Sequence, residues 1–165
     1  GDARAAFADH ELKSVVDDTH FRNHHADQPA FQRLGRVPAL ERDGVERLDL
    51  VEADAVALDC ARANLTDPRA AFHWADATQW KPDRPADAVV CNPPFHAGRE
   101  TDTGLGVAFL RAAARMLAPQ GVLWLVANRP LPYDRPLTEA FRDVEEVGGD
   151  AAFRVIRAAH PRRGR

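Results

Sequence analysis

The segment from Ala86 to His96, ADAVVCNPPFH, combines an apolar strand with groups that can hold an amine. Its apolar run predicts a buried strand, which must end at Asn92 because Pro93-Pro94 has no N–H for a strand ladder. The first proline is also held in an extended conformation by the second. The sequence therefore predicts a rigid corner that carries an amide side chain, a proline carbonyl with no competing partner, and the aromatic ring of Phe95.

These groups match the needs of an amino nitrogen on a planar ring. The Asn92 side-chain oxygen and the Pro93 carbonyl can accept both N–H bonds of such a group, and Phe95 can stack on the ring. The nitrogen lone pair then points at an electrophile, so positioning supplies much of the catalysis. The alternative is structural, with the prolines as a stiff connector and Phe95 in the core.

Two acidic residues are predicted at the ends of neighbouring strands. Glu52 ends a strand over Val45 to Glu52, and Asp76 follows a short strand over Ala70 to Trp74. Ligands of open parallel sheets bind outside the carboxyl ends of the strands, where Asn92 is also predicted to lie. An acid at the end of the second strand can accept hydrogen bonds from both ribose hydroxyls, so we expect Glu52 to bind a cofactor ribose; the alternative is an acid that faces water.

From Val45 onward, predicted strands and helices alternate along the chain. This order predicts an α/β, Rossmann-like, doubly wound and mostly parallel sheet with a C-terminal antiparallel hairpin. Asp54 is the predicted N-cap of the first helix, whose inner face would carry Val56, Cys60 and Ala61. The other expected elements are helices at Thr103 to Leu117 and Pro136 to Phe141, a strand at Val122 to Ala127, and a hairpin of Val144 to Val147 with Phe153 to Ala158.

The N-terminal part has a different pattern. Ala3 to Val16 reads as an amphipathic helix, so we expect an extra N-terminal helical segment. The stretch from Asp17 to Asp27 is rich in histidine and aspartate, with His20 and His24 four residues apart. A metal site there is conceivable, but a solvated helix end or loop is favoured and no metal is expected. The expected division is residues 1–36 (helical segment), 37–160 (catalytic domain) and 161–165 (a disordered basic tail).

Composition limits the class of protein. A chain of 165 residues is long enough for one domain with a real core, and its charged content is ordinary for a globular protein. No apolar run is long enough to span a membrane, and no signal peptide is visible, so a cytoplasmic location is expected. Cys60 and Cys91 suit reduced thiols. The net charge of −3 means that any RNA contact must come from a local basic patch.

The sequence Asn92 to Phe95, NPPF, resembles the signature of class I S-adenosylmethionine-dependent methyltransferases that act on nitrogen. With the following His96, and with VANRPLPY at Val126 to Tyr133, the chain most closely resembles the methyltransferases of guanine N2 in small-subunit ribosomal RNA. The similarity runs from about Val45 to His160.

The resemblance implies S-adenosylmethionine as the cofactor and a guanine amino group of ribosomal RNA, or of the small ribosomal subunit, as the substrate. It assigns catalysis to the NPPF residues, with Asn92 also at the cofactor. It further implies that Asp76 accepts from the adenine amino group and that the Ala77 N–H donates to an adenine ring nitrogen. Two alternatives stay open: methylation of an adenine amino group or a protein glutamine, and a non-catalytic scaffold that binds RNA or a partner.

The chain departs from the family in one place. The family has a first strand and a glycine-rich loop before the acidic strand, and neither is visible upstream of Val45. Either a strand and loop are missing near Gly35 to Pro38, so that the sequence joins segments that are not natural neighbours, or the protein lacks the loop and is degenerate. The first is favoured, because Val37 to Gly44 reads as the end of the helix that should follow the loop. Covalent neighbours lie about 3.8 Å apart at Cα, which provides a test.

Overall fold

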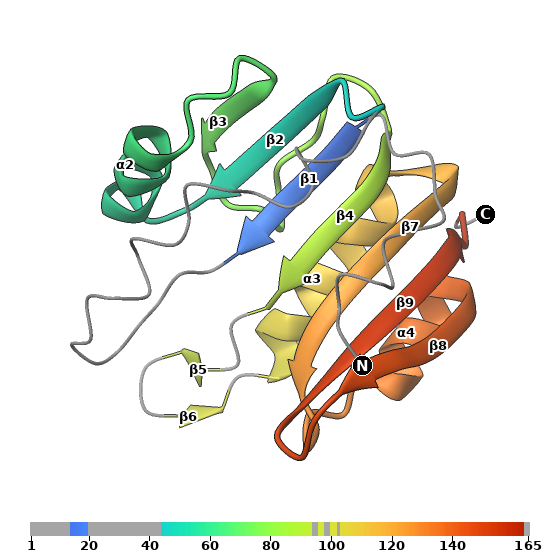
Figure 1. Ribbon diagram of the computed structural model, residues 1–165. Coiled ribbons are helices and arrows are strands. Elements are labelled where there is room, and N and C mark those ends of the chain that lie inside the picture. Colours follow the sequence, from blue (N-terminus) through green and yellow to red (C-terminus); the bar gives the residue numbers. More distant parts are fainter. Residues whose placement is uncertain (1–13, 20–43, 94–95, 98–99, 102, 164–165) are drawn as a thin grey trace.

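The computed structural model describes residues 14–19, 44–93, 96–97, 100–101 and 103–163, which form an α/β layered fold (Figure 1). Seven of the described strands make one sheet in the order β3-β2-β1-β4-β7-β9-β8. Their bounds are β1 Ser14–Thr19, β2 Arg47–Glu52, β3 Ala70–Trp74, β4 Ala86–Asn92, β7 Leu117–Asn128, β8 Phe141–Gly149 and β9 Phe153–Pro161. A separate pair consists of β5 (His96–Ala97) and β6 (Glu100–Thr101).

The first five strands of that order are parallel, β9 pairs antiparallel with β7, and β8 pairs antiparallel with β9. The predicted parallel sheet with a closing hairpin is therefore confirmed. Strand order reverses beside β1, since the chain builds outward through β2 and β3 on one side and through β4 and β7 on the other. Such a switch point is where open α/β sheets bind ligands.

The N-terminal prediction is wrong where it can be compared with the structure. Ser14–Thr19 is not the end of a helix but strand β1, at the centre of the sheet between β2 and β4. The sheet therefore includes part of the segment 1–36 that was assigned outside the catalytic domain. A first strand is thus present before Val45. Both explanations given above, a missing segment near Gly35 to Pro38 and a degenerate protein, had assumed that this strand was absent. The histidines at 20 and 24 and the junction at 35–38 lie outside the described residues.

Three described helices cover the sheet: α2 (Ala55–Asn64), α3 (Thr103–Met116) and α4 (Asp134–Ala140). The predicted cap of α2 is confirmed, because the Asp54 side chain accepts from the N–H groups of Val56 and Ala57. Its predicted inner face is wrong: Leu58 is fully buried, whereas Val56 is 72% exposed. Leu58 and Val56 are two residues apart, which is about 200° around a helix, so burial of one exposes the other.

The largest core cluster lies between the sheet and the pair α3 and α4, which are together behind the sheet as viewed in Figure 1. The apolar side of α3 supplies Phe109, Ala112, Ala113 and Met116, as its periodicity predicts. A second cluster fills the other face near α2, with Leu48 and Leu50 of β2 and Ala88 of β4. Alternate residues of β2 and β4 therefore face opposite sides, as expected for central strands.

The C-terminal residues are more ordered than the sequence prediction allowed. His160 and Pro161 end β9, and Arg162 continues with a backbone N–H that donates to the Ala140 carbonyl at 2.7 Å. The Arg163 guanidinium donates to the Leu117 carbonyl at 2.8 Å. The expected disordered tail is therefore wrong through Arg163, because backbone carbonyls of α4 and β7 anchor it.

Candidate functional site

The carboxyl ends of β1, β2 and β4 bring the predicted residues to one edge of the sheet. Thr19 of β1 is paired with Asn92 of β4, and on its other side β1 is paired with β2, with Asp17 opposite Leu50, two residues before Glu52. Glu52 is paired in turn with Trp74 of β3. Neighbouring strands are about 4.8 Å apart, so the Glu52 and Asn92 backbones are separated by roughly 10 Å across β1. The sequence prediction that these strand ends meet is confirmed.

Glu52 lies inside this edge rather than on its outer surface. Its side chain is 6% exposed, and its Oε1 accepts a hydrogen bond from the Asp54 N–H at 2.7 Å. The Glu52 carbonyl accepts from the Ala75 N–H, which ties the end of β2 to the turn after β3. The bond from the Asp54 N–H therefore fixes the orientation of the Glu52 carboxylate at the end of β2.

The turn after β3 fixes Asp76 through one of its two carboxylate oxygens. Oδ1 accepts from the Thr78 backbone N–H at 2.8 Å and from the Thr78 hydroxyl at 2.7 Å. The Thr78 carbonyl is held in turn by the Arg115 guanidinium of α3 at 2.8 Å. Asp76 is exposed, and its Oδ2 bonds to none of the described residues. The Ala77 N–H likewise has no acceptor among them, although Ala77 is 6% exposed. One acceptor and one donor thus lie side by side without partners in the described chain.

The strand before the prolines ends where the sequence predicted. β4 ends at Asn92, which is exposed, while Pro93 is buried. The Asn92 side chain makes no hydrogen bond to the described residues, so its oxygen is available as an acceptor. The predicted site residues Pro94 and Phe95 lie outside the described residues, and their parts in the site stay predictions.

Tyr133 lies near Cys91, the residue before Asn92, and the sequence pattern alone did not assign it a role. Its side chain is fully buried, with its hydroxyl against Gly106 of α3, where an added Cβ would lie 1.9 Å from the oxygen. Burial, and secondarily the nearby Cys91 thiol of β4, raise the pKa of Tyr133. Tyr133 ends the VANRPLPY segment, so the sequence signal was the motif, but only the fold shows the contact.

The two tryptophans of this region differ from each other. Trp74 is 71% exposed, and its indole N–H donates to the Ala53 carbonyl at 3.0 Å. β3 is the edge strand of the sheet, so its last residue has no neighbour on one side. Trp80 packs against the main core and lies 4.8 Å from the His73 ring.

The described residues hold neither a metal-binding cluster nor a membrane-spanning helix. No group of three or more His, Cys, Asp or Glu side chains there is arranged to hold a metal ion. No helix in that part of the chain has the length and apolar character to cross a membrane.

Comparison with known proteins then identifies the family. The model of the methyltransferase small domain matches residues 33–157, which is most of the chain. The chain belongs to the methyltransferase small domain family. The methyltransferase family predicted from the NPPF sequence is therefore confirmed.

Curated relatives of this methyltransferase small domain are named for both ribosomal subunits. The chain is 35% identical over 118 residues to the ribosomal RNA large subunit methyltransferase G of Shewanella amazonensis, covering 68% of this chain and 31% of the relative. It is 47% identical over 72 residues to the ribosomal RNA small subunit methyltransferase C of Alcanivorax borkumensis, covering 44% and 22%. The chain thus spans a third or less of the length of these relatives.

Solved structures confirm the fold. The 16S rRNA N2 G1207 methyltransferase of T. thermophilus, in complex with AdoMet and guanosine, aligns with a TM-score of 0.61 and 19% identity, covering 91% of this chain and 35% of that one. The N-methyltransferase NodS of Bradyrhizobium japonicum, in complex with S-adenosyl-L-homocysteine, aligns with a TM-score of 0.65 and 15% identity, covering 92% and 79%.

Proposed function

We propose that this methyltransferase small domain transfers a methyl group from S-adenosylmethionine to the exocyclic amino group of a guanine in ribosomal RNA. The observation that carries the proposal is the shared edge of the sheet. Glu52, Asp76 and Asn92 follow three strands whose carboxyl ends meet beside β1, at the switch point of strand order. One edge therefore holds the acids expected for a nucleoside and the amide expected for an amine.

The described donors and acceptors fit an adenosine-containing cofactor. Asp76 Oδ2 and the Ala77 N–H, neither bonded to a described residue, form the acceptor–donor pair that the adenine edge requires. Glu52 is oriented by Asp54 at the end of β2, where ribose hydroxyls bind in related sheets. When bound, S-adenosylmethionine supplies an electrophilic methyl group on a sulfonium sulfur.

Asn92 and Pro93 would position the substrate amine. The Asn92 side-chain oxygen and the Pro93 carbonyl accept the two N–H bonds, which leaves the nitrogen lone pair directed out of the ring plane. As the N–C bond forms, the S–C bond breaks and positive charge develops on the nitrogen. The two oxygens stabilise that charge, and the extra proton leaves to solvent. Phe95 would stack on the guanine ring.

Within ribosomal RNA, we propose the small subunit as the target. Support comes from the NPPFH and VANRPLPY segments and from the 47% identity to a small subunit methyltransferase. A second candidate is the large subunit, favoured by the longer match to a large subunit methyltransferase over 118 residues.

A methyl-transfer assay tests both the reaction and the subunit. The chain would be incubated with tritium-labelled S-adenosylmethionine and, in separate reactions, with small subunits, large subunits and the naked RNA of each. Nucleoside analysis after digestion should give N2-methylguanosine from the small subunit or its RNA. Label in large-subunit RNA alone would select the second candidate. Label in adenine, or no label in any substrate, would contradict the proposal.

A further inference from the structure

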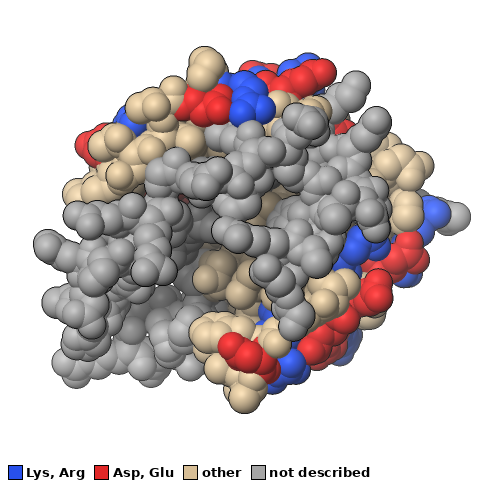
Figure 2. Space-filling model, viewed as in Figure 1, with Lys and Arg blue, Asp and Glu red and all other residues tan. Residues whose placement is uncertain are grey.

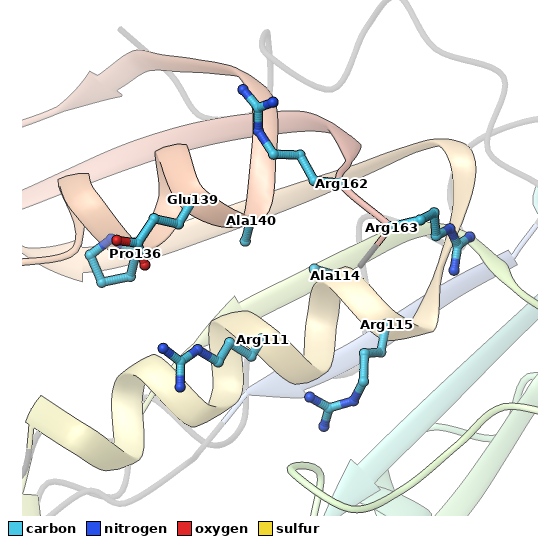
Figure 3. A pocket seen from close by; sticks show the side chains of 8 residues that line it. All are labelled: Arg111, Ala114, Arg115, Pro136, Glu139, Ala140, Arg162 and Arg163. Carbon is cyan, nitrogen blue, oxygen red and sulfur yellow. The ribbon is translucent and has the colours of Figure 1, made fainter. Parts of the chain in front are cut away.

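A basic cleft lies away from the strand ends, between α3 and α4. Its volume is about 310 Å³, and one acid, Glu139, is among its eight lining residues. Arginines dominate it: Arg111, Arg115, Arg162 and Arg163. The first two extend from α3 and the last two follow β9, so two segments that are distant in sequence contribute positive charge to one place (Figure 3).

The positive charge of this cleft is not neutralised within the described chain. None of its four arginines forms an ion pair with a described carboxylate, and Glu139 is itself paired with Arg135 at 2.7 Å. By contrast, six other arginines have acidic partners: Arg47, Arg62, Arg69, Arg129, Arg135 and Arg154. On the face shown in Figure 2, described blue and red residues also lie next to each other along the rim. The cleft therefore stands out in a chain whose net charge is −3.

Backbone carbonyls orient three of the cleft arginines without removing their charge. Arg115 donates to the Thr78 carbonyl, Arg162 to the Phe141 carbonyl at 3.0 Å, and Arg163 to the Leu117 carbonyl. A guanidinium has five N–H donors, so one such bond leaves four for an external acceptor. Arg111 makes no hydrogen bond to a described residue and retains all five. All four side chains are exposed, so a ligand can reach them.

The arrangement suits several anionic groups better than one. In Figure 3 the guanidinium groups lie around the cleft and point in different directions rather than meeting at a point. Arg111 and Arg115 lie about 12 Å and 18 Å along α3 from its start near the Asn92 corner, at 1.5 Å per residue. A single phosphate would reach only part of this set, whereas a nucleic-acid strand presents a row of phosphates.

We propose that the arginine cleft between α3 and α4 binds the phosphodiester backbone of the RNA substrate at a distance from the methylated base. This inference rests on the proposed function for the identity of the RNA. The cleft then supplies the local basic patch that a chain of net negative charge needs for RNA binding. A mononucleoside or a very short RNA would not span from the corner to the cleft.

The test is RNA binding as a function of salt, measured by fluorescence anisotropy with a labelled single-stranded 24-nucleotide RNA. Arg111→Gln and Arg111→Glu are the informative variants, because Arg111 holds no described residue in place. Arg62→Gln and Arg62→Glu on α2 are the matched controls, exposed and at the far side of the sheet. Each phosphate contact to a single strand contributes about 0.7 to the slope of log K against log salt, or about fivefold in affinity at 0.1 M salt.

Arg111→Gln should therefore weaken binding about fivefold and lower the slope by about 0.7, with a larger loss for Arg111→Glu and no change for the Arg62 variants. Equal effects at the two positions, or no RNA binding by the parent chain in 50 mM salt, would overturn the cleft assignment. Competition by millimolar inorganic phosphate beyond its ionic-strength effect would assign the cleft to a free anion instead. Methyl transfer by the parent chain is measured in a separate assay. If the parent chain transfers no methyl group but its RNA binding still depends on Arg111, the proposed reaction is refuted and the cleft assignment is not.

Discussion

Replacing Gly106 by alanine tests whether the Tyr133 ring is tightly packed against α3. Intrinsic helix propensity alone predicts that this change stabilises α3 by about 1 kcal/mol. The structure predicts the opposite, because the new Cβ would lie 1.9 Å from the Tyr133 hydroxyl oxygen, 2.6 Å from Cζ and 2.9 Å from Cε1. Tyr133 is fully buried in the main core cluster, so its ring cannot move into solvent.

The net cost of the Gly106 change follows from these two opposing effects. Overpacking a well-filled core costs typically 1–3 kcal/mol, and three contacts below 3.0 Å place this case at or above the upper end. After the propensity gain of about 1 kcal/mol, we expect Gly106→Ala to lower the free energy of unfolding by about 2 kcal/mol or more. The ring contacts beyond the hydroxyl mean that Tyr133→Phe should rescue only part of this loss.

The assay is urea denaturation followed by tryptophan fluorescence. Gly104→Ala is the matched control, since Gly104 is exposed on the same helix and reports propensity without burial. Tyr133→Phe alone should change stability by less than about 1 kcal/mol, because its buried hydroxyl has no hydrogen-bond partner in the described chain. Stabilisation by Gly106→Ala equal to that by Gly104→Ala would refute the packing argument.

Three further changes have defined outcomes. Asp76→Asn should weaken S-adenosylhomocysteine binding about tenfold in calorimetry, because an amide N–H would face the adenine amino group; an unchanged affinity would contradict that contact. Hydrogen bonds from the Arg69 side chain and backbone lower the pKa of Asp67 to about 2, below the unfolded value near 3.9. The stabilisation by ionised Asp67 is thus complete above about pH 4 and is lost as the pH falls toward 2. Asp67→Asn should therefore flatten the decrease of the urea midpoint between about pH 4 and pH 2, and an identical decrease in both proteins would contradict this role of Asp67. Asp134→Ala should cost about 1–2 kcal/mol in urea unfolding, because it removes two hydrogen bonds from the Arg154 guanidinium, which is 10% exposed; no loss would show that this pair is neutral.

Much of the site could be predicted from sequence because it depends on where strands stop. Pro93-Pro94 ends β4 through missing N–H groups, and Asp54 begins α2 through its side-chain cap, both of which are local effects. Parallel strands then bring Glu52 and Asn92 to one edge without any further information. The family resemblance added the roles of these residues, which the fold alone does not assign.

The parts that could not be predicted depend on tertiary contacts. β1 has only two apolar residues, Val15 and Val16, and its place between β2 and β4 overrides the helical pattern that precedes it. The orientation of α2 is set by a single fully buried side chain, Leu58, on a helix with several small apolar residues that fit either face. The order of the C-terminal arginines depends on carbonyl acceptors that lie far away in sequence.

The central claim is that Asn92 acts on the substrate amine at an edge of the sheet that also holds the cofactor. It is tested most directly by measuring tritium transfer and S-adenosylhomocysteine affinity for Asn92→Ala side by side. We expect transfer to ribosomal RNA to fall about 100-fold or more, as for loss of one hydrogen bond to a developing charge, while the affinity changes only a few-fold. Transfer that proceeds undiminished in Asn92→Ala would contradict the account.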